Sequence, residues 1–286
     1  IPNFVAKSLK QKKSSTIGVI VANILHTFST EMIRAIEDVC KINDFHLFVC
    51  NADDNPEKER AYIDMLMAKQ VDGLIILPTQ DKIDFYEQLK RNQFPIVFVD
   101  RLPEQILYPT LMLDNQMAAE MAVKKLTESG HTKIGAVSLS ISRNITPRIE
   151  RIQGFKQALQ RRGIIPNNNW IIAEKRENII HKLEVIWEGE DRPEAFFATN
   201  DLSLIELLKF VRKTKLRVPD DISVIAIDDN DFLEIALTPI TSIKQPTFDI
   251  GKEAAITLLN LIADRNLKDS YEIKRFTPLL IERESI

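Results

Sequence analysis

The stretch RVPDDISVIAIDD, residues 217–229, places a turn, a strand and two carboxylates one after another. Pro219 restricts φ, and the two aspartates after it favour a turn that starts the strand. The run 222–227 is almost wholly apolar and rich in β-branched residues, which is typical of a strand covered by helices on both faces. Asp228 and Asp229 follow at its carboxyl end, where parallel α/β sheets bind ligands.

Apolar strand-like runs alternate with helix-period segments along the whole chain, which predicts an α/β fold with parallel sheets. The expected strands are 17–22, 46–50, 73–77, 96–99, 134–138, 195–198 and 222–227. The expected helices are 30–42, 56–69, 84–91, 116–128, 148–162 and 202–213. Asn55-Pro56 and Thr146-Pro147 each offer an N-cap before a proline at the first helical position, and Gly130 and Gly163 are suited to left-handed C-caps.

Polar side chains recur where the expected strands end. They are Asn23, Asn51, Asp53, Asp100, Arg101, Ser140, Asn200, Asp201, Asp228 and Asp229. Most of these residue types are also good helix N-caps, so any one of them could serve the next helix only. Their recurrence in both halves of the chain favours a polar cleft lined by two sheets. Residues 111–115 and 238–246 look like crossings between two α/β halves, which would form a multi-strand hinge.

Composition limits the class of protein. The chain has 286 residues, enough for one large or two medium domains, with 44% hydrophobic and 28% charged residues. The formal charge of -3 gives no global attraction to nucleic acid or anionic membrane. Cys40 and Cys50 are expected to be buried thiols in a reducing compartment. Neither a membrane-length apolar run nor a signal-peptide pattern is present, so a cytoplasmic location is expected.

Segments along nearly the full length resemble one known family. They are IPNFVAKSL, STIGVIVANI, KQVDGLIILP, FPIVFVDR, MLDN, ESGHTKIGAVS, RIQGFKQAL, FFATNDLSL, RVPDDISVIAIDD, ITSIKQP, IGKEAAITLL and LLIERES. In this order they resemble the effector-binding core of the LacI/GalR family of bacterial transcription regulators, which is similar to periplasmic sugar-binding proteins. PTLMLDN and ITPRIERI further resemble regulators of 2-keto-3-deoxygluconate utilisation.

The resemblance implies two Rossmann-like subdomains of the type I periplasmic-binding-protein-like fold, with the effector between them. The expected division is a remnant of the hinge helix and linker over 1–13, an N-terminal subdomain of 14–112 plus 243–274, and a C-terminal subdomain of 113–242 plus 275–286. It also implies a homodimer that contacts operator DNA only through a helix-turn-helix headpiece absent from this chain.

Arginines around residue 148 carry the most specific chemistry. If Pro147 opens a helix, Arg148 and Arg151 share a face near its N-terminus, where cations oppose the helix dipole by about 0.3–1 kcal/mol. Glu150 or another surface carboxylate could compensate. An anionic ligand could also do so, because arginine donates two parallel hydrogen bonds to a carboxylate or phosphate. The resemblance matches Arg151 to the family's effector-contacting arginine, and Arg143 is a further expected donor.

Other binding residues are carried over from the resemblance. Asp228 matches the acceptor for ligand hydroxyls, and Phe28 and Ser29 match a ligand contact at the start of the first helix. Phe197 could pack on a ligand or belong to the core. Asn200 could contact ligand or cap a helix.

Asp100 and Arg101 complete the expected ligand-binding set, and Asp229 is expected to be a helix cap. Several arginines together with a carboxylate favour a sugar acid as effector, with a sugar phosphate or a neutral sugar as alternatives. No P-loop, GxGxxG, GxSxG or HExxH motif is present, so neither catalysis, a cofactor nor a metal is expected. The expected function is effector sensing in a repressor of carbohydrate metabolism, and the alternative is an extracytoplasmic sugar-binding receptor of a transport system.

Overall fold

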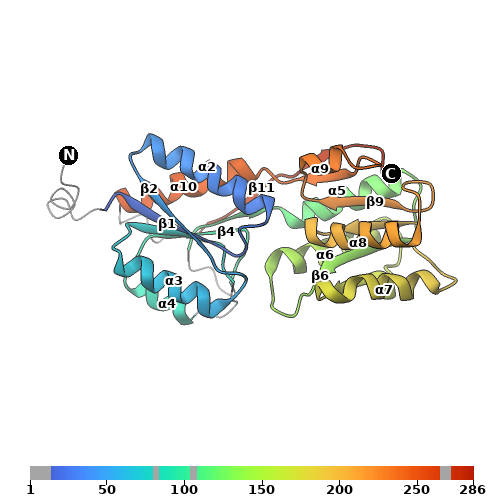
Figure 1. Ribbon diagram of the computed structural model, residues 1–286, viewed down its shortest axis with the longest axis horizontal. Coiled ribbons are helices and arrows are strands. Elements are labelled where there is room, and N and C mark those ends of the chain that lie inside the picture. Colours follow the sequence, from blue (N-terminus) through green and yellow to red (C-terminus); the bar gives the residue numbers. More distant parts are fainter. Residues whose placement is uncertain (1–13, 80–83, 104–107, 265–271) are drawn as a thin grey trace. The chain divides into compact units, whose positions relative to one another are not determined.

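The computed structural model describes residues 14–79, 84–103, 108–264 and 272–286 (Figure 1). The chain forms two compact units. Unit 1 comprises Ile1–Met112 and Thr247–Arg275, and unit 2 comprises Leu113–Pro246 and Phe276–Ile286. The chain therefore passes from one unit to the other three times. The expected hinge-helix remnant, residues 1–13, lies outside the described residues.

Unit 1 contains a six-stranded sheet in the order β11-β5-β4-β3-β1-β2. Its strands are β1 (Thr16–Val21), β2 (His46–Asn51), β3 (Gly73–Ile76), β4 (Ile96–Val99), β5 (Thr110–Leu113) and β11 (Ile273–Phe276). Its helices are α2 (Thr27–Ile42), α3 (Pro56–Ala68), α4 (Asp84–Arg91) and α10 (Thr247–Ala263). Helices α2 and α10 pack together on one face, and α3 and α4 lie on the other (Figure 1).

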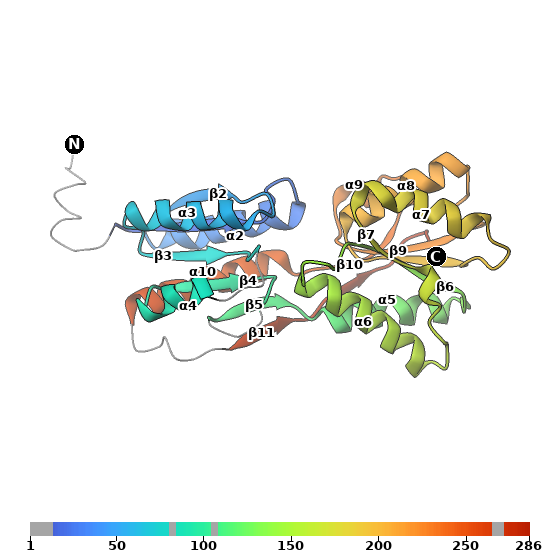
Figure 2. The same ribbon diagram turned by 90° about the horizontal axis from the view of Figure 1, so that it is seen from below.

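Unit 2 repeats this arrangement with the order β12-β10-β9-β8-β6-β7. Its strands are β6 (Ile134–Leu139), β7 (Ile171–Glu174), β8 (Ala195–Ala198), β9 (Ser223–Ile227), β10 (Thr241–Lys244) and β12 (Leu279–Ile281). Its helices are α5 (Asn115–Glu128), α6 (Thr146–Arg161), α7 (Arg176–Glu188), α8 (Asp201–Thr214) and the short α9 (Asp231–Glu234). Figure 2 shows α5 and α6 on one face of this sheet and α7 and α8 on the other, and a separate apolar core fills each interface.

The strand predicted from RVPDDISVIAIDD is β9, and all five of its residues are buried. It pairs in parallel with β8 and with β10, which explains its continuous apolar sequence. A glycine allows two helices to approach closely in each unit. A Cβ at Gly251 of α10 would lie 2.7 Å from the Met32 carbonyl oxygen of α2, and one at Gly154 of α6 would lie 3.1 Å from the Gln116 Cα of α5.

Several local predictions are confirmed and others need correction. Asn55 caps α3 by accepting from the Lys58 amide, and Gly130 and Gly163 have φ of +93° and +73°. Helix α6 instead begins at Thr146, so Thr146 is not its N-cap and Pro147 is its second residue.

The expected boundary between residues 242 and 243 falls inside β10, because Ile243 and Lys244 still pair within the sheet of unit 2. The boundary therefore lies after Pro246. Strand β7 and helices α7 and α10 were not among the expected elements. None of the helices in the described residues is long and apolar enough to cross a membrane.

Candidate ligand-binding site

Each unit holds one aspartate in a strained backbone conformation directly after a buried strand. Asp100 follows β4 with φ of 66°, and Asp228 follows β9 with φ of 78°. The Asp100 amide donates to the Leu111 carbonyl of β5 at 2.8 Å, and the Asp228 amide donates to the Ile243 carbonyl of β10 at 3.1 Å. A left-handed non-glycine residue typically costs about 1–3 kcal/mol and is frequent at functional sites. In both sheets, therefore, a left-handed aspartate follows a buried strand and its amide bonds to the neighbouring strand.

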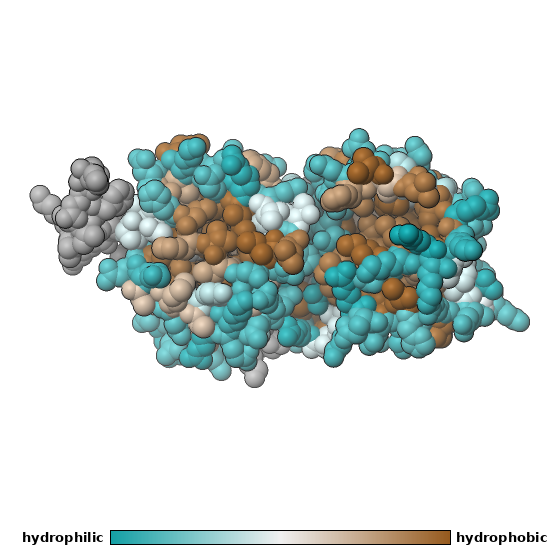
Figure 3. Space-filling view, in the orientation of Figure 1, coloured by the Kyte–Doolittle hydropathy of each residue, from teal (hydrophilic) through white to brown (hydrophobic). Residues whose placement is uncertain are grey.

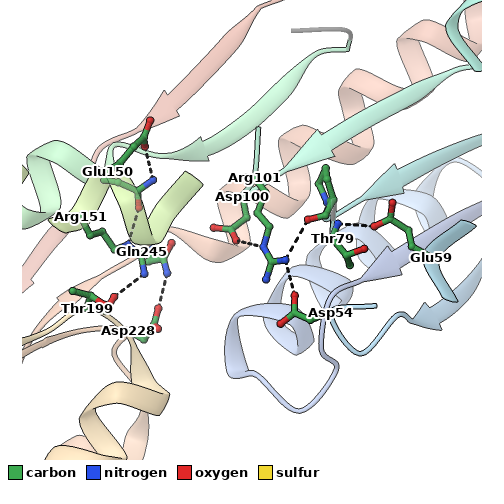
Figure 4. A network of polar contacts seen from close by, with 12 residues as sticks. Asp54, Glu59, Thr79, Asp100, Arg101, Glu150, Arg151, Thr199, Asp228 and Gln245 are labelled. Carbon is green, nitrogen blue, oxygen red and sulfur yellow. Dashed lines mark hydrogen bonds and ion pairs between the residues drawn. The ribbon is translucent and has the colours of Figure 1, made fainter. Parts of the chain in front are cut away.

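Arg151 lies at the centre of a polar network in unit 2 (Figure 4). Its side chain is buried, its Nε donates to Asn115 Oδ1 at 2.8 Å, and its Nη1 donates to the Thr199 carbonyl at 2.8 Å. The amide of Asn115 donates in turn to Glu150 at 2.9 Å. These bonds join the first turns of α5 and α6 to the carboxyl end of β8, so they hold a buried cation at this edge of the sheet.

Asp228 lies at the same edge and is held by two donors. Its Oδ1 accepts from Gln245 Nε2 at 2.5 Å, and its Oδ2 accepts from the Asp201 amide at 3.1 Å. Burial raises the pKa of Asp228 above its ordinary value, and the positive charge of Arg151 opposes that rise. The carboxylate is therefore costly to ionise in this position, and an additional donor would stabilise its charged form.

Arg148, in the first turn of α6, and Arg143, on the β6–α6 connection, flank this network. Arg148 is half-buried, and its Nη1 donates to the Ser140 carbonyl at 2.9 Å. Arg143 is exposed. The structure therefore places Arg148 with Arg151 near the carboxyl end of β6, whereas Arg143 stands on the exposed part of the loop.

The sequence left two roles open for each of Phe197 and Asn200; in the structure Phe197 belongs to the core and Asn200 caps a helix. Phe197 is fully buried in the core and stacks on Phe155 with ring centroids 5.9 Å apart. Asn200 caps α8: its Oδ1 accepts from the Ser203 amide, while its own amide donates to Ser203 Oγ, each at 3.1 Å. A ligand contact by Asn200 stays a prediction.

Asp229 is not a helix cap, contrary to the prediction. Its Oδ1 accepts from Ser242 Oγ at 2.7 Å and from Arg283 Nη1 at 2.8 Å, and the cap of α9 is Asn230. The two adjacent carboxylates therefore differ in role: Asp229 ties β9 and β10 to the C-terminal segment, while Asp228 lies at the polar edge. The sequence around Asp229 contains no signal for this ion pair, because Arg283 is far away along the chain.

In unit 1 the matching edge is organised by Arg101 (Figure 4). Its Nη1 donates to Asp54 at 2.6 Å and to the Pro78 carbonyl at 3.2 Å, and its Nε lies 3.8 Å from the Asp100 carboxylate. Arg101 thus joins the segments that follow β2, β3 and β4. At the start of α2, Ser29 is buried and Phe28 is half-buried.

Several buried polar atoms have no hydrogen-bond partner within the described residues. Three of them are Thr79 Oγ1, Arg101 Nε and Ser138 Oγ. An unsatisfied buried polar group costs about 1–3 kcal/mol. Thr79 and Arg101 follow β3 and β4, and Ser138 is the penultimate residue of β6. All three therefore lie at the carboxyl ends of parallel strands, where such a fold binds ligands.

Sequence reasoning missed Asn115, Thr199 and Gln245, which contact Arg151 or Asp228. Asn115 and Gln245 lie in the quoted segments MLDN and ITSIKQP. Both also lie in the stretches 111–115 and 238–246 that were expected to cross between the two halves of the chain, and this position was the available signal. Thr199 acts through its backbone carbonyl, which any residue could supply.

Two features elsewhere do not add to this site. A cavity of about 540 Å³ lies along β7 and α7 and is lined by Trp170, Glu174 and Lys182 among others, none of them a predicted site residue. Within the described part of the chain, no group of three or more His, Cys, Asp or Glu side chains could hold a metal ion.

Comparisons with known proteins agree with this architecture. The family description "Periplasmic binding protein-like domain" matches residues 123–286, which is more than half of the chain. The whole chain is 38% identical to EndR of Paenibacillus polymyxa, named as an HTH-type transcriptional regulator, and 34% identical to the HTH-type transcriptional repressor PurR of Photobacterium profundum. It covers 85% of the length of each.

Solved structures show the same fold at lower identity. Transcription regulator CcpA of Lactococcus lactis is 24% identical with a TM-score of 0.82, over 94% of this chain and 98% of that one. A sugar-binding regulator of the LacI family from Escherichia coli, solved with phosphate, is 24% identical with a TM-score of 0.79, over 96% and 99%. With relatives named as regulators across its full length and this two-unit fold, the chain belongs to the LacI family of transcriptional regulators.

Proposed function

We propose that this chain is the effector-sensing core of a repressor of carbohydrate metabolism, and that the carboxyl edge of unit 2 binds the effector. The observation that carries the proposal is the convergence of Arg151 and Asp228 at that edge, two opposite charges withdrawn from water and held by different partners. Both side chains lie near a strand end that is suited to ligands. The relatives' names support regulation.

The charges favour an effector that carries both hydroxyls and an anionic group. The Asp228 carboxylate can accept from sugar hydroxyls, and a hydrogen bond to a charged group contributes about 1.5–3 kcal/mol. Arg151 and Arg148 can donate to a carboxylate or phosphate, with Arg143 on the adjacent loop. A sugar acid therefore fits best, and 2-keto-3-deoxygluconate is the first compound to test.

Unit 1 is proposed to contribute through Asp100 and Arg101, with Phe28 and Ser29 at the start of α2. What supports this is the unsatisfied Arg101 Nε and the left-handed backbone of Asp100, which matches that of Asp228 in unit 2. That one effector contacts both units remains a prediction. If it does, effector binding would favour one relative placement of the units, and operator affinity would follow.

A thermal-shift panel of sugar acids, sugar phosphates and neutral sugars tests the proposed effector class. We expect an anionic sugar to raise the melting temperature of the chain, and Arg148→Ala to weaken the shift. Arg161→Ala is the matched control, because Arg161 lies in the last turn of the same helix and pairs with Glu120. If only neutral sugars stabilise the chain and Arg148→Ala has no effect, the anionic class is wrong.

We further propose that the chain forms a homodimer and acts in the cytoplasm, with operator DNA contacted through a helix-turn-helix headpiece of the longer protein. What supports self-association is exposed apolar surface on both units (Figure 3). Phe48 and Val49 of β2 are 43% and 41% exposed, and Phe232, Ile235 and Leu237 around α9 are 77%, 76% and 105% exposed. Sedimentation equilibrium of the chain and of Phe232→Asp would test whether this surface pairs two copies.

The relatives described above are named as regulators and not as enzymes, so we propose recognition without catalysis. The alternative of a transport receptor shares the fold but is not favoured by any of those names.

A further inference from the structure

Glu59 of α3 is a fully buried acidic residue whose carboxylate accepts hydrogen bonds from two other segments of unit 1. One oxygen accepts from the Thr79 amide at 2.7 Å, and the other accepts from the hydroxyl of Tyr86 in α4. Burying a carboxylate is expensive unless hydrogen bonds compensate, and these two donors do so. A leucine or methionine would fill the space without that cost, so the position of the acid calls for a role.

The Thr79 amide belongs to the same peptide group as the Pro78 carbonyl. Glu59 binds the N–H end of that group, and Arg101 Nη1 donates to its C=O end at 3.2 Å (Figure 4). A peptide group is planar, so holding the N–H direction also holds the direction of the C=O. An anion at the donor end and a cation at the acceptor end polarise the group in the same sense and strengthen both bonds.

The Pro78 carbonyl is one of two hydrogen-bond acceptors that hold Arg101 Nη1, the other being Asp54 at 2.6 Å. The Arg101 side chain is only 12% exposed, so few other orientations are open to it. Moving the Pro78 carbonyl would leave the guanidinium held by Asp54 and by the weaker 3.8 Å contact of its Nε with Asp100. The direction of this carbonyl, together with Asp54, therefore limits where the remaining Arg101 donors point.

We propose that Glu59 is a positioning residue: it acts through the Pro78–Thr79 peptide to orient the Arg101 guanidinium for effector binding, and it does not contact the effector. This inference rests on the proposed role of Arg101 at the edge of unit 1. It extends that role to a residue at which the sequence shows only an ordinary charged helix position.

The first test needs no ligand. In ¹⁵N spectra of the full chain, Glu59→Ala is expected to speed hydrogen exchange of the Thr79 amide at least tenfold and to shift the Arg101 Nε–Hε resonance. Glu59→Gln keeps an acceptor for the Thr79 amide and should restore both signals in large part. Tyr86→Phe removes the other bond only and should leave the Arg101 resonance in place. Glu206→Gln, which alters a buried acid of unit 2, is the matched control.

The second test is a double-mutant cycle on the affinity for 2-keto-3-deoxygluconate and 6-phosphogluconate as probes. We expect Glu59→Ala to weaken binding about tenfold in the native background and not at all in an Arg101→Met background, because its effect passes through Arg101. Equal losses in both backgrounds would overturn the proposal, since they indicate general destabilisation. An unchanged Arg101 resonance in Glu59→Ala would also overturn it.

The two proposals can fail separately. If neither probe nor any sugar of the panel binds the native chain, or if Arg101→Met binds as well as the native chain, the proposed function of Arg101 fails. The spectra then still decide whether Glu59 orients Arg101.

Discussion

Two neighbouring aspartates, Asp228 and Asp229, should differ in how much the same isosteric change affects the stability of the ligand-free protein. Asp229→Asn removes a charge that faces Arg283, whose side chain is 13% exposed, while Asp228→Asn removes a charge at the polar edge. We predict that Asp229→Asn lowers the free energy of unfolding and that Asp228→Asn changes it little.

The magnitude follows from the contacts of each side chain. Asp229 Oδ1 accepts two hydrogen bonds, from Ser242 and Arg283. Bonds to a charged group contribute about 1.5–3 kcal/mol each and are roughly twice as strong as neutral ones. An asparagine keeps the acceptor oxygen but loses the charge, so about half of each bond is lost, or about 1.5–3 kcal/mol in total.

For Asp228 two effects oppose each other. Its folded-state pKa is raised by burial, so its contribution to stability is present below the ordinary pKa of an aspartate and is lost as the pH rises through the raised value. Ionising the buried carboxylate is thus costly, and asparagine removes that cost. Asparagine cannot accept from both Gln245 and the Asp201 amide, which costs about 1 kcal/mol, and it tolerates the left-handed backbone. The net change should stay within about 1 kcal/mol.

Urea denaturation at pH 7, followed by tryptophan fluorescence, measures this difference. Trp170 and Trp187 both lie in unit 2, as do the two aspartates, and they are the chain's two tryptophans, so the signal reports that unit alone. With a urea dependence of about 1–3 kcal/mol per molar, Asp229→Asn should lower the midpoint by about 1 M. The reasoning is refuted if Asp228→Asn lowers the midpoint as much as Asp229→Asn does.

Three further predictions concern other buried groups. Thr79→Val and Ser138→Ala should each raise the unfolding free energy by about 1 kcal/mol, because the lost hydroxyl has no partner in the described residues. Thr241→Val should instead lower the unfolding free energy, because the Thr241 hydroxyl bonds to the backbone of Arg283. Equal losses of stability in all three variants would contradict this. Burial alone would raise the pKa of Glu206, yet hydrogen bonds from Arg176 and Lys209 outweigh it and hold the pKa below its ordinary value. The contribution of Glu206 to the free energy of unfolding is present above the ordinary pKa of a glutamate and is lost as the pH falls. In urea titrations between about pH 5 and 3, Glu206→Gln should therefore lose less stability than the native chain does. Burial raises the pKa of Cys40 to about 11 and that of Cys50 in the same direction, so Ellman's reagent at pH 8 should label both slowly unless urea is added; rapid labelling of the native chain would count against it.

The architecture could be predicted because its strands are buried on both faces. A strand such as β9 needs an uninterrupted apolar sequence, and such a run is visible without any tertiary information. Asn55, Gly130 and Gly163 marked helix ends through backbone chemistry that is local as well. Strand β7 and helix α7 were missed because β7 has only four residues and neither glycine nor proline separates it from α7.

The site could be predicted only in part, because its residue types are right but their partners are distant. Asp228 and Asp229 are chemically identical and adjacent, and only the folded position of Arg283 assigns the second to an ion pair. Phe197 of β8 shares its pattern with ligand-stacking aromatics, yet Phe155 of α6 stacks on it within the core. In the sequence Glu59 resembles any exposed charge near the start of a helix, and only the fold brings the Thr79 amide and the Tyr86 hydroxyl to its carboxylate.

The most direct measurement of the central claim is the affinity of Asp228→Asn and Asp229→Asn, by isothermal titration calorimetry, for the compound that stabilises the native chain most. If Asp228 accepts the effector's hydroxyls through one or two charged hydrogen bonds, Asp228→Asn should lose about 3 kcal/mol, or about 100-fold in affinity. Asp229→Asn should bind within about twofold of the native chain despite its lower stability. Equal affinities of the two variants would show that the carboxyl edge of unit 2 is not where this protein recognises its effector.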